Sequence, residues 1–155
     1  MTFKVLTLVT ALCISSISAF AQNPSKKMNN KASIKTVIET FVKAGTERNI
    51  ALYEGILHDD FRVIANRYPA PDKTSIISAD TYKDLITKKV IGGTQYKIDF
   101  KDISISDHSA TVEVELKSDK GGQVITFLLI QNNEAKWLII TDMACLLYTS
   151  DAADD

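Results

Sequence analysis

The sequence predicts an α+β domain in which helices come first and a curved antiparallel sheet follows. Apolar residues recur at helical spacing between Ile34 and Val42, and they alternate with polar residues between Ala110 and Leu116. Helices grouped before antiparallel strands are typical of α+β domains. A chain of 155 residues, 45% apolar and 24% charged, has the size and composition of one compact domain.

Three helices are predicted before the main run of strands. Their N-caps are predicted at Ser33, Asn49 and Ser78, and their ends at Gly45, at the charged run 58–60 and at Gly92-Gly93. Their inner faces carry Ile34, Val37, Ile38, Phe41 and Val42 in the first helix, Leu52, Tyr53, Ile56 and Leu57 in the second, and Tyr82, Leu85, Ile86 and Val90 in the third. The apolar face of each helix needs an apolar surface to pack against.

The strands follow from period-two alternation. A short strand over 61–65 and a return strand over 74–77 flank a loop with two prolines. Four longer strands are predicted over 96–105, 110–116, 124–130 and 136–141, and a phase slip in the first of them indicates a bulge near Asp102. The strand 124–130 is apolar on both faces and is expected at the centre. We expect these four strands to curl around the first helix.

The N-terminal segment predicts export. Lys4 precedes an apolar run over 5–14, and Ala19-Phe20-Ala21 is suited to cleavage by a signal peptidase. The run is shorter than the roughly 20 apolar residues that a membrane span needs. We therefore expect a signal peptide over 1–21, a flexible leader over 22–31, a folded domain over 32–144, and a periplasmic or secreted location without a membrane span.

The C-terminal segment 145–155 matches one translated frame of a common transposase sequencing adapter. We expect these residues to be adapter read-through rather than native sequence, with the natural residues after Ala144 missing; the alternative is a genuine acidic tail. Cys13 lies in the signal segment and Cys145 in this stretch, so the mature domain has no cysteine for a disulfide or a thiolate nucleophile. The net charge of −1 gives no electrostatic drive for binding nucleic acid.

Three segments carry a resemblance to a known family: the helix over 34–44, the segment 49–63, and the closing strand 136–140 around Trp137. In this order they resemble the nuclear-transport-factor-2-like superfamily, and most of all its small bacterial lumazine-binding-like and SnoaL-like members. The resemblance spans 34–143. It implies a cone-shaped, curved antiparallel sheet wrapped around three helices, a cystatin-like roll, in a superfamily that includes isomerases, dehydratases, cyclases and non-catalytic binding domains.

The catalytic residues that this resemblance implies do not carry over. Steroid isomerases of this fold use an Asp base, a Tyr donor and a protonated Asp. The corresponding positions are Ala65 or Asn66 for the base, Phe41 for the donor and Phe127 for the second acid. None of these side chains accepts a proton from carbon, so the activity cannot be transferred.

No metal or cofactor is expected. His58 and His108 lie in separate segments and form no ligand spacing. His58 is expected to stabilise the end of the second helix through the helix dipole; the alternative is an acid–base pair with Asp59 or Asp60, or part of a metal site.

We therefore expect a binding domain for a small apolar or aromatic ligand, without catalytic residues. Its pocket is predicted between helix and sheet, with Phe41, Tyr53, Val63, Tyr68, Tyr82, Phe100, Phe127 and Trp137 as ligand contacts. A homodimer is expected through the outer sheet face, which carries Leu138, Ile140 and one side of 124–130. The alternative is a cofactor-free lyase or isomerase that uses Asp60, His58 or Tyr82. A titratable side chain pointing into the pocket with a perturbed pKa would favour that alternative.

Overall fold

The computed structural model describes residues 24–68, 70–119 and 121–146. The predicted signal peptide and residues 147–155 of the predicted read-through lie outside the described residues. The elements, in chain order, are α1 (Pro24–Glu47), the 3-10 helix η1 (Ile50–Tyr53), β1 (Leu57–Asn66), β2 (Thr74–Ser78), α2 (Ala79–Thr87), β3 (Lys97–Ser106), β4 (Ser109–Ser118), β5 (Gly121–Gln131) and β6 (Trp137–Leu146).

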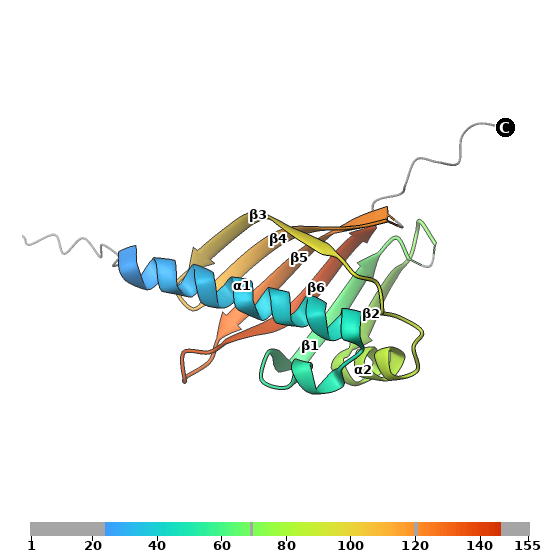
Figure 1. Cartoon of the computed structure of the whole chain (residues 1–155), viewed down its shortest axis with the longest axis horizontal. Coiled ribbons are helices and arrows are strands. Elements are labelled where there is room, and N and C mark those ends of the chain that lie inside the picture. Colours follow the sequence, from blue (N-terminus) through green and yellow to red (C-terminus); the bar gives the residue numbers. More distant parts are fainter. Residues whose placement is uncertain (1–23, 69, 120, 147–155) are drawn as a thin grey trace, which may run out of the picture.

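The six strands form one sheet in the order β2-β1-β6-β5-β4-β3. Neighbouring strands are antiparallel except β1 and β6, which run parallel. Figure 1 shows α1 lying across one face of the sheet and α2 near the β1–β2 end. The predicted α+β fold, a curved sheet around helices, is confirmed, and the parallel β1–β6 pair makes the sheet mixed.

The first helix is longer than predicted. It begins at Pro24, which suits a first helical position because proline lacks only an N–H that would have no helical partner there. The helix therefore includes most of the segment predicted as a flexible leader. Ile34, Ile38 and Phe41 are buried, as the apolar stripe predicts.

The second helix is shorter than predicted, and the strand after it is longer. The Asn49 side chain accepts a hydrogen bond from the Ala51 N–H at 3.2 Å, but the turn ends at Tyr53. His58, Asp59 and Asp60 lie in β1, so the prediction that they end a helix is wrong. The reason is a distant partner: β1 pairs with β6, and the Ile139 N–H donates to the Ile56 carbonyl at 2.8 Å.

Local patterns elsewhere are confirmed. The Ser78 side chain accepts from the Thr81 N–H at the start of α2, and the register of β3 shifts between Phe100 and Asp102. The central position of β5 between β4 and β6 agrees with its two apolar faces. Val90 is exposed rather than part of the third stripe, because α2 ends at Thr87.

A bulge in β6 changes which side chains face the helices. Leu129 pairs with Ile139 and Leu128 pairs with Thr141, so Ile140 is one extra residue in β6. Before the bulge, Ile139 is buried on the inner face; after it, Asp142 is buried. If β6 alternated regularly through Ile140, Thr141 would face inward and Asp142 outward. The bulge therefore decides that a carboxyl group enters the interior.

Candidate functional site

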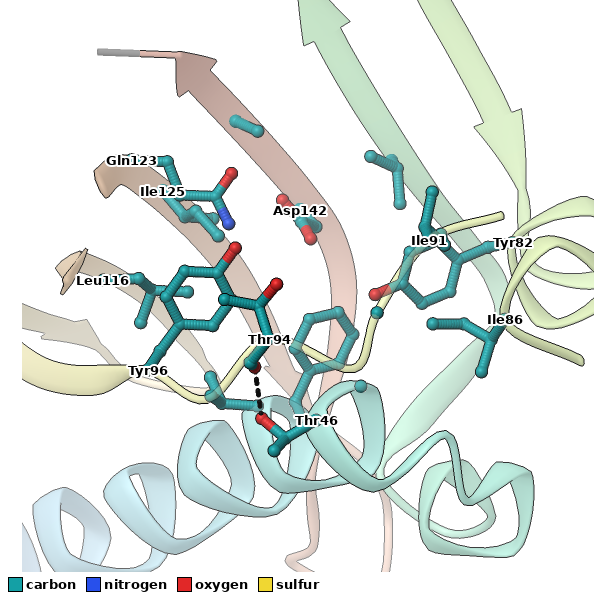
Figure 2. Close-up of a pocket in the computed structure, with 16 residues that line it drawn as sticks. Thr46, Tyr82, Ile86, Ile91, Thr94, Tyr96, Leu116, Gln123, Ile125 and Asp142 are labelled. Atoms are coloured by element: carbon teal, nitrogen blue, oxygen red, sulfur yellow. Dashed lines mark hydrogen bonds between the residues drawn. The ribbon is translucent and has the colours of Figure 1, made fainter. Parts of the chain in front are cut away.

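A cavity of about 260 Å³ lies between the end of α1, α2, the segment before β3 and the inner face of the sheet, and we call it the Asp142 cavity (Figure 2). Its apolar walls include Phe41, Val63, Ile86, Leu116, Ile125 and Ala144. Its polar groups are Thr46, Tyr82, Thr94, Tyr96, Gln123 and Asp142. Apolar walls with a few convergent polar groups are typical of small-molecule sites, whose volumes start at about 300 Å³. The volume suits a small ligand.

Asp142 is the buried carboxyl of this cavity, with a residue exposure of 5%. Its partners in neighbouring strands are Val63 on β1 and Phe127 on β5, so apolar side chains flank it on both sides. Its Oδ1 atom has no hydrogen-bond partner among the described residues. Burial raises the pKa of Asp142 to about 7, because the charged form loses its hydration.

We expected a pocket without a proton-transferring group, and the buried carboxyl group of Asp142 contradicts that expectation. In the sequence, Trp137 and Ile139 set the inward positions of this strand. Regular alternation from them predicts that Asp142 points outward into water. A bulge inside an apolar strand leaves no composition signal of its own. An acidic residue shortly after the apolar run 137–140 was the one feature of the sequence that could have pointed to this position.

Two phenols pair beside the cavity, and one of them, Tyr82, lines it. The hydroxyl oxygens of Tyr53 and Tyr82 are 3.4 Å apart and share a hydrogen bond in which either can donate. Burial raises the pKa of Tyr53 to about 12 and the pKa of Tyr82 well above its usual value. Both groups therefore stay protonated at neutral pH. Figure 2 shows Tyr82 on one side of Asp142, and Tyr96 and Gln123 on the other.

An aromatic cluster lies beneath the cavity and reaches it through Phe41 and Tyr82. The Phe41 ring contacts four other rings, with centroid distances of 5.3 Å to Tyr53, 5.9 Å to Phe61, 5.9 Å to Tyr82 and 5.2 Å to Phe127. The Tyr82 ring is stacked on Phe41 with an interplanar angle of 8°. These rings come from α1, η1, β1, α2 and β5, so the cluster joins helices and sheet.

The segment after α2 forms a wall that is fastened to the end of α1. The Gly93 N–H donates to the Gly45 carbonyl at 2.9 Å, and Arg48 Nη2 donates to the Gly92 carbonyl at 2.7 Å. The Thr46 hydroxyl donates to the Thr94 carbonyl at 2.9 Å, the dashed line in Figure 2. This wall was predicted only as a turn, since its docking depends on residues that are distant in sequence.

The structure brings together three of the eight predicted ligand contacts: Phe41, Val63 and Tyr82 line the Asp142 cavity. Tyr53 and Phe127 do not line it, because they pack against Phe41 in the aromatic cluster. The roles of all eight as ligand contacts stay predictions.

The other three predicted contacts lie away from the cavity. Tyr68 follows β1 and is 51% exposed. Phe100 lies on β3 with Lys35 Nζ at 5.0 Å from its ring centroid. Trp137 is buried at the start of β6. These residues were predicted as ligand contacts because their side chains are large. The position of each strand in the sheet decides which of them reaches the cavity.

Of the side chains considered as acid–base groups, only Tyr82 lines the cavity. His58 Nδ1 instead accepts a hydrogen bond from the Asp60 backbone N–H at 3.1 Å on β1. Within the described parts of the chain, no three His, Cys, Asp or Glu side chains are grouped so that they could hold a metal ion. Among the same residues, no helix combines the length and the apolar character that crossing a membrane requires.

Comparisons with known proteins agree on family and fold. A family model described as "Putative lumazine-binding" matches residues 29–143. An NTF2-like protein of unknown function from Shewanella baltica OS155 has 13% identity and a TM-score of 0.66, over 76% of this chain and 94% of that chain. One from Silicibacter pomeroyi DSS-3 has 15% identity and a TM-score of 0.66, over 81% and 99%.

A third solved structure is that of a "putative ketosteroid isomerase" from Shewanella frigidimarina NCIMB 400. It has 18% identity and a TM-score of 0.53, over 73% of this chain and 94% of that chain. No curated protein sequence matches. At these identities the solved structures establish a shared fold, and function has to be argued from the cavity itself.

Proposed function

Because the chain belongs to the family described as "Putative lumazine-binding", we propose that it binds a small, flat, mostly apolar molecule in the Asp142 cavity. The observation that carries this proposal is an apolar cavity lined by Asp142, whose buried Oδ1 atom has no hydrogen-bond partner among the described residues. A buried polar atom without a partner costs free energy, and a ligand that pairs with it removes that cost.

The cavity supports a ring-shaped ligand in particular. Its floor is the Phe41 ring, with Tyr82 stacked beside it, and its polar groups lie on the rim and on the sheet side. Aromatic and apolar walls bind flat rings, whereas a small number of polar groups orient them. A pteridine of the lumazine type has this shape and carries ring N–H groups.

Binding is tested with lumazine and toluene as probes, and ligand-observed NMR and calorimetry measure it. A cavity-filling variant, Ala144→Leu, should weaken binding of both probes by about tenfold or more, because its side chain occupies the space of the ring. Ala51 is exposed on η1, so Ala51→Leu is the matched control and should bind as the unaltered chain does. Absence of binding, or equal binding by Ala144→Leu, contradicts the proposal.

A second candidate function is cofactor-free acid–base catalysis on a bound carbon acid. It is favoured by the pKa of about 7 at Asp142, since such a group exchanges protons readily at neutral pH. Here the base would be Asp142 rather than Asp60 or His58. Exchange of the α-protons of cyclohexanone into D₂O, measured by NMR, tests it. Acceleration that disappears in Asp142→Asn supports catalysis, and no acceleration supports binding alone.

The proposed destination of the chain is outside the cytoplasm. Support comes from the residue pattern of 1–21, with one positive charge, an apolar run and an A-x-A site. Expression of the full chain in an exporting bacterium, with mass spectrometry of the periplasmic product, should find an N-terminus at Gln22. Retention of Met1 to Ala21 contradicts export.

Self-association through the outer sheet face is the proposed assembly. Ile64 on β1 pairs with Ile76 on one side and Met143 on the other, which makes an apolar row across three strands. Leu128 and Met143 are 41% and 39% exposed on this face. Native mass spectrometry should find a dimer that Leu128→Lys converts to monomer. A monomer before substitution contradicts this assembly.

A further inference from the structure

We propose that the ligand of the Asp142 cavity presents an N–H donor to Asp142, most favourably from a protonated amine or amidine, and that the cavity rejects carboxylates and phosphates. This inference rests on the proposed binding function and specifies the chemical class of its ligand. It is argued from the partners, the charges and the position of the groups that line the cavity.

The first argument is the unpartnered oxygen. Two buried side-chain atoms among the described residues have no hydrogen-bond partner, Trp137 Nε1 and Asp142 Oδ1, and only Asp142 lines the cavity. The ionised form of the carboxyl group only accepts hydrogen bonds, so the missing partner of that form is a donor. An N–H from a charged group is the strongest such donor, because the pair then also gains Coulomb energy in surroundings of low dielectric constant.

The second argument is the absence of a cation. No Lys, Arg or His is among the described residues that line the cavity. Arg48, whose guanidinium reaches the wall, donates to the carbonyl oxygens of Ile91 and Gly92 at 3.3 and 2.7 Å. An anionic ligand would therefore lie beside an acidic group with no opposite charge to offset its lost hydration.

The titratable groups that face Asp142 do not change this balance. Tyr82 on α2 lines the cavity with Asp142, and Tyr82 and Tyr53 on η1 both interact with Asp142 electrostatically. Tyr96 lines the cavity from the segment before β3. The raised pKa values of Tyr53 and Tyr82 keep both phenols neutral, so their hydroxyl groups can donate or accept without selecting the charge of a ligand.

Three ring probes of similar shape separate the charge classes: benzamidine is a cation, benzamide a neutral N–H donor and benzoate an anion. We expect affinities in the order benzamidine, benzamide, benzoate, with about tenfold or more between cation and anion. At pH 6 Asp142 is mostly protonated, so cation binding should release about one proton per site, and at pH 8 almost none. Calorimetry in two buffers of different ionisation enthalpy measures this release.

Asp142→Asn keeps the shape of the side chain and removes its charge. It should lower the affinity for benzamidine by about tenfold or more and abolish the proton release at pH 6. The affinity for toluene should stay within about threefold of that of the unaltered chain. Asp59 is exposed on β1, so Asp59→Asn removes one negative charge outside the cavity and should change none of these values. Circular dichroism of each variant verifies that it is folded.

The outcomes separate this inference from the function on which it rests. If toluene binds but benzoate binds as well as benzamidine, the charge preference is wrong and the binding function stands. The same conclusion follows if Asp142→Asn retains the preference. If neither toluene nor any charged probe binds, both the function and the inference are overturned.

Discussion

Asp142 holds an ionisable group in apolar surroundings, and this has a cost for the fold itself. Its neighbours in the sheet are Val63 and Phe127, and burial alone accounts for its raised pKa. The cost falls on the ionised form, because that form loses most of its hydration free energy on burial. A group of this kind makes stability depend on pH in a direction opposite to that of an ordinary paired carboxylate.

The stability of the folded chain should fall as pH rises from about 4 to 7. In the unfolded chain Asp142 ionises near its ordinary pKa of 3.8, and in the folded protein near 7. Between these values the folded state binds more protons, so rising pH favours unfolding, and above pH 7 the effect levels off. The full difference between the two pKa values lowers the free energy of unfolding by about 4 kcal/mol, at about 1.4 kcal/mol for each tenfold change in the ionisation constant.

Urea unfolding of the chain and of Asp142→Asn, from pH 4 to pH 8, measures this effect. The variant should gain stability relative to the unaltered chain as pH rises, because it carries no charge to bury. Subtracting the two curves removes the contribution of other titratable groups such as Glu115, whose pKa is lowered by its hydrogen bond with Lys101. The exposed variant Asp59→Asn is the control. A constant difference between the two curves across this range would mean that the carboxyl is hydrated in the folded state.

At the scale of elements, the shape of the cavity depends on how one loop meets the end of α1. Gly92 adopts φ +78°, and a Cβ placed there would lie 2.5 Å from the Gly45 carbonyl oxygen and 3.0 Å from Ile86 Cδ1. The left-handed backbone and the close approach are separate constraints. Together they hold Ile91 and Thr94 in the wall of the cavity.

Substitutions at two glycines separate these constraints. Gly55 has φ +77°, and a Cβ placed there would meet no atom within 4 Å, so Gly55→Ala tests the backbone alone. It should cost about 1 kcal/mol, and Gly92→Ala about 2 kcal/mol or more, because the methyl group also displaces the Gly45 carbonyl. Urea unfolding measures both. Gly92→Ala should also weaken toluene binding, whereas equal costs for the two variants would mean that the loop is not tightly docked.

At the scale of the whole molecule, the aromatic cluster around Phe41 connects the layers. Phe41 on α1 contacts rings from η1, β1, α2 and β5, and it also forms the floor of the cavity. Stability and binding therefore depend on the same side chain. In such close packing, loss of one ring strongly lowers the free energy of unfolding, because the neighbouring side chains cannot all move to fill the space.

Phe41→Ala should lower the free energy of unfolding by about 3–5 kcal/mol. Phe100→Ala is the matched comparison, since Phe100 is only partly buried and packs at the edge of the core, beside Lys35. It should cost clearly less. Thermal unfolding followed by near-ultraviolet circular dichroism measures both variants. A similar loss in the two would show that the cluster has no special place in the fold.

Features that depend on near neighbours could be predicted from the sequence. The caps at Asn49 and Ser78, the stripe of Ile34, Ile38 and Phe41, and the bulge near Asp102 are all confirmed. Each arises from residues within a turn or two of one another, where hydrogen bonding and side-chain spacing act locally. These patterns determine the helices, most of the strands and the α+β class.

The tertiary structure decided the cavity and its carboxyl group. The parallel pairing of β1 with β6 turned the expected helix end at His58 into strand, and the extra residue Ile140 turned Asp142 inward. Both result from hydrogen bonds between segments far apart in the chain, whose free energy outweighs local preference. The sequence alone determined which residues could be buried, and only the packed sheet decided which acid was.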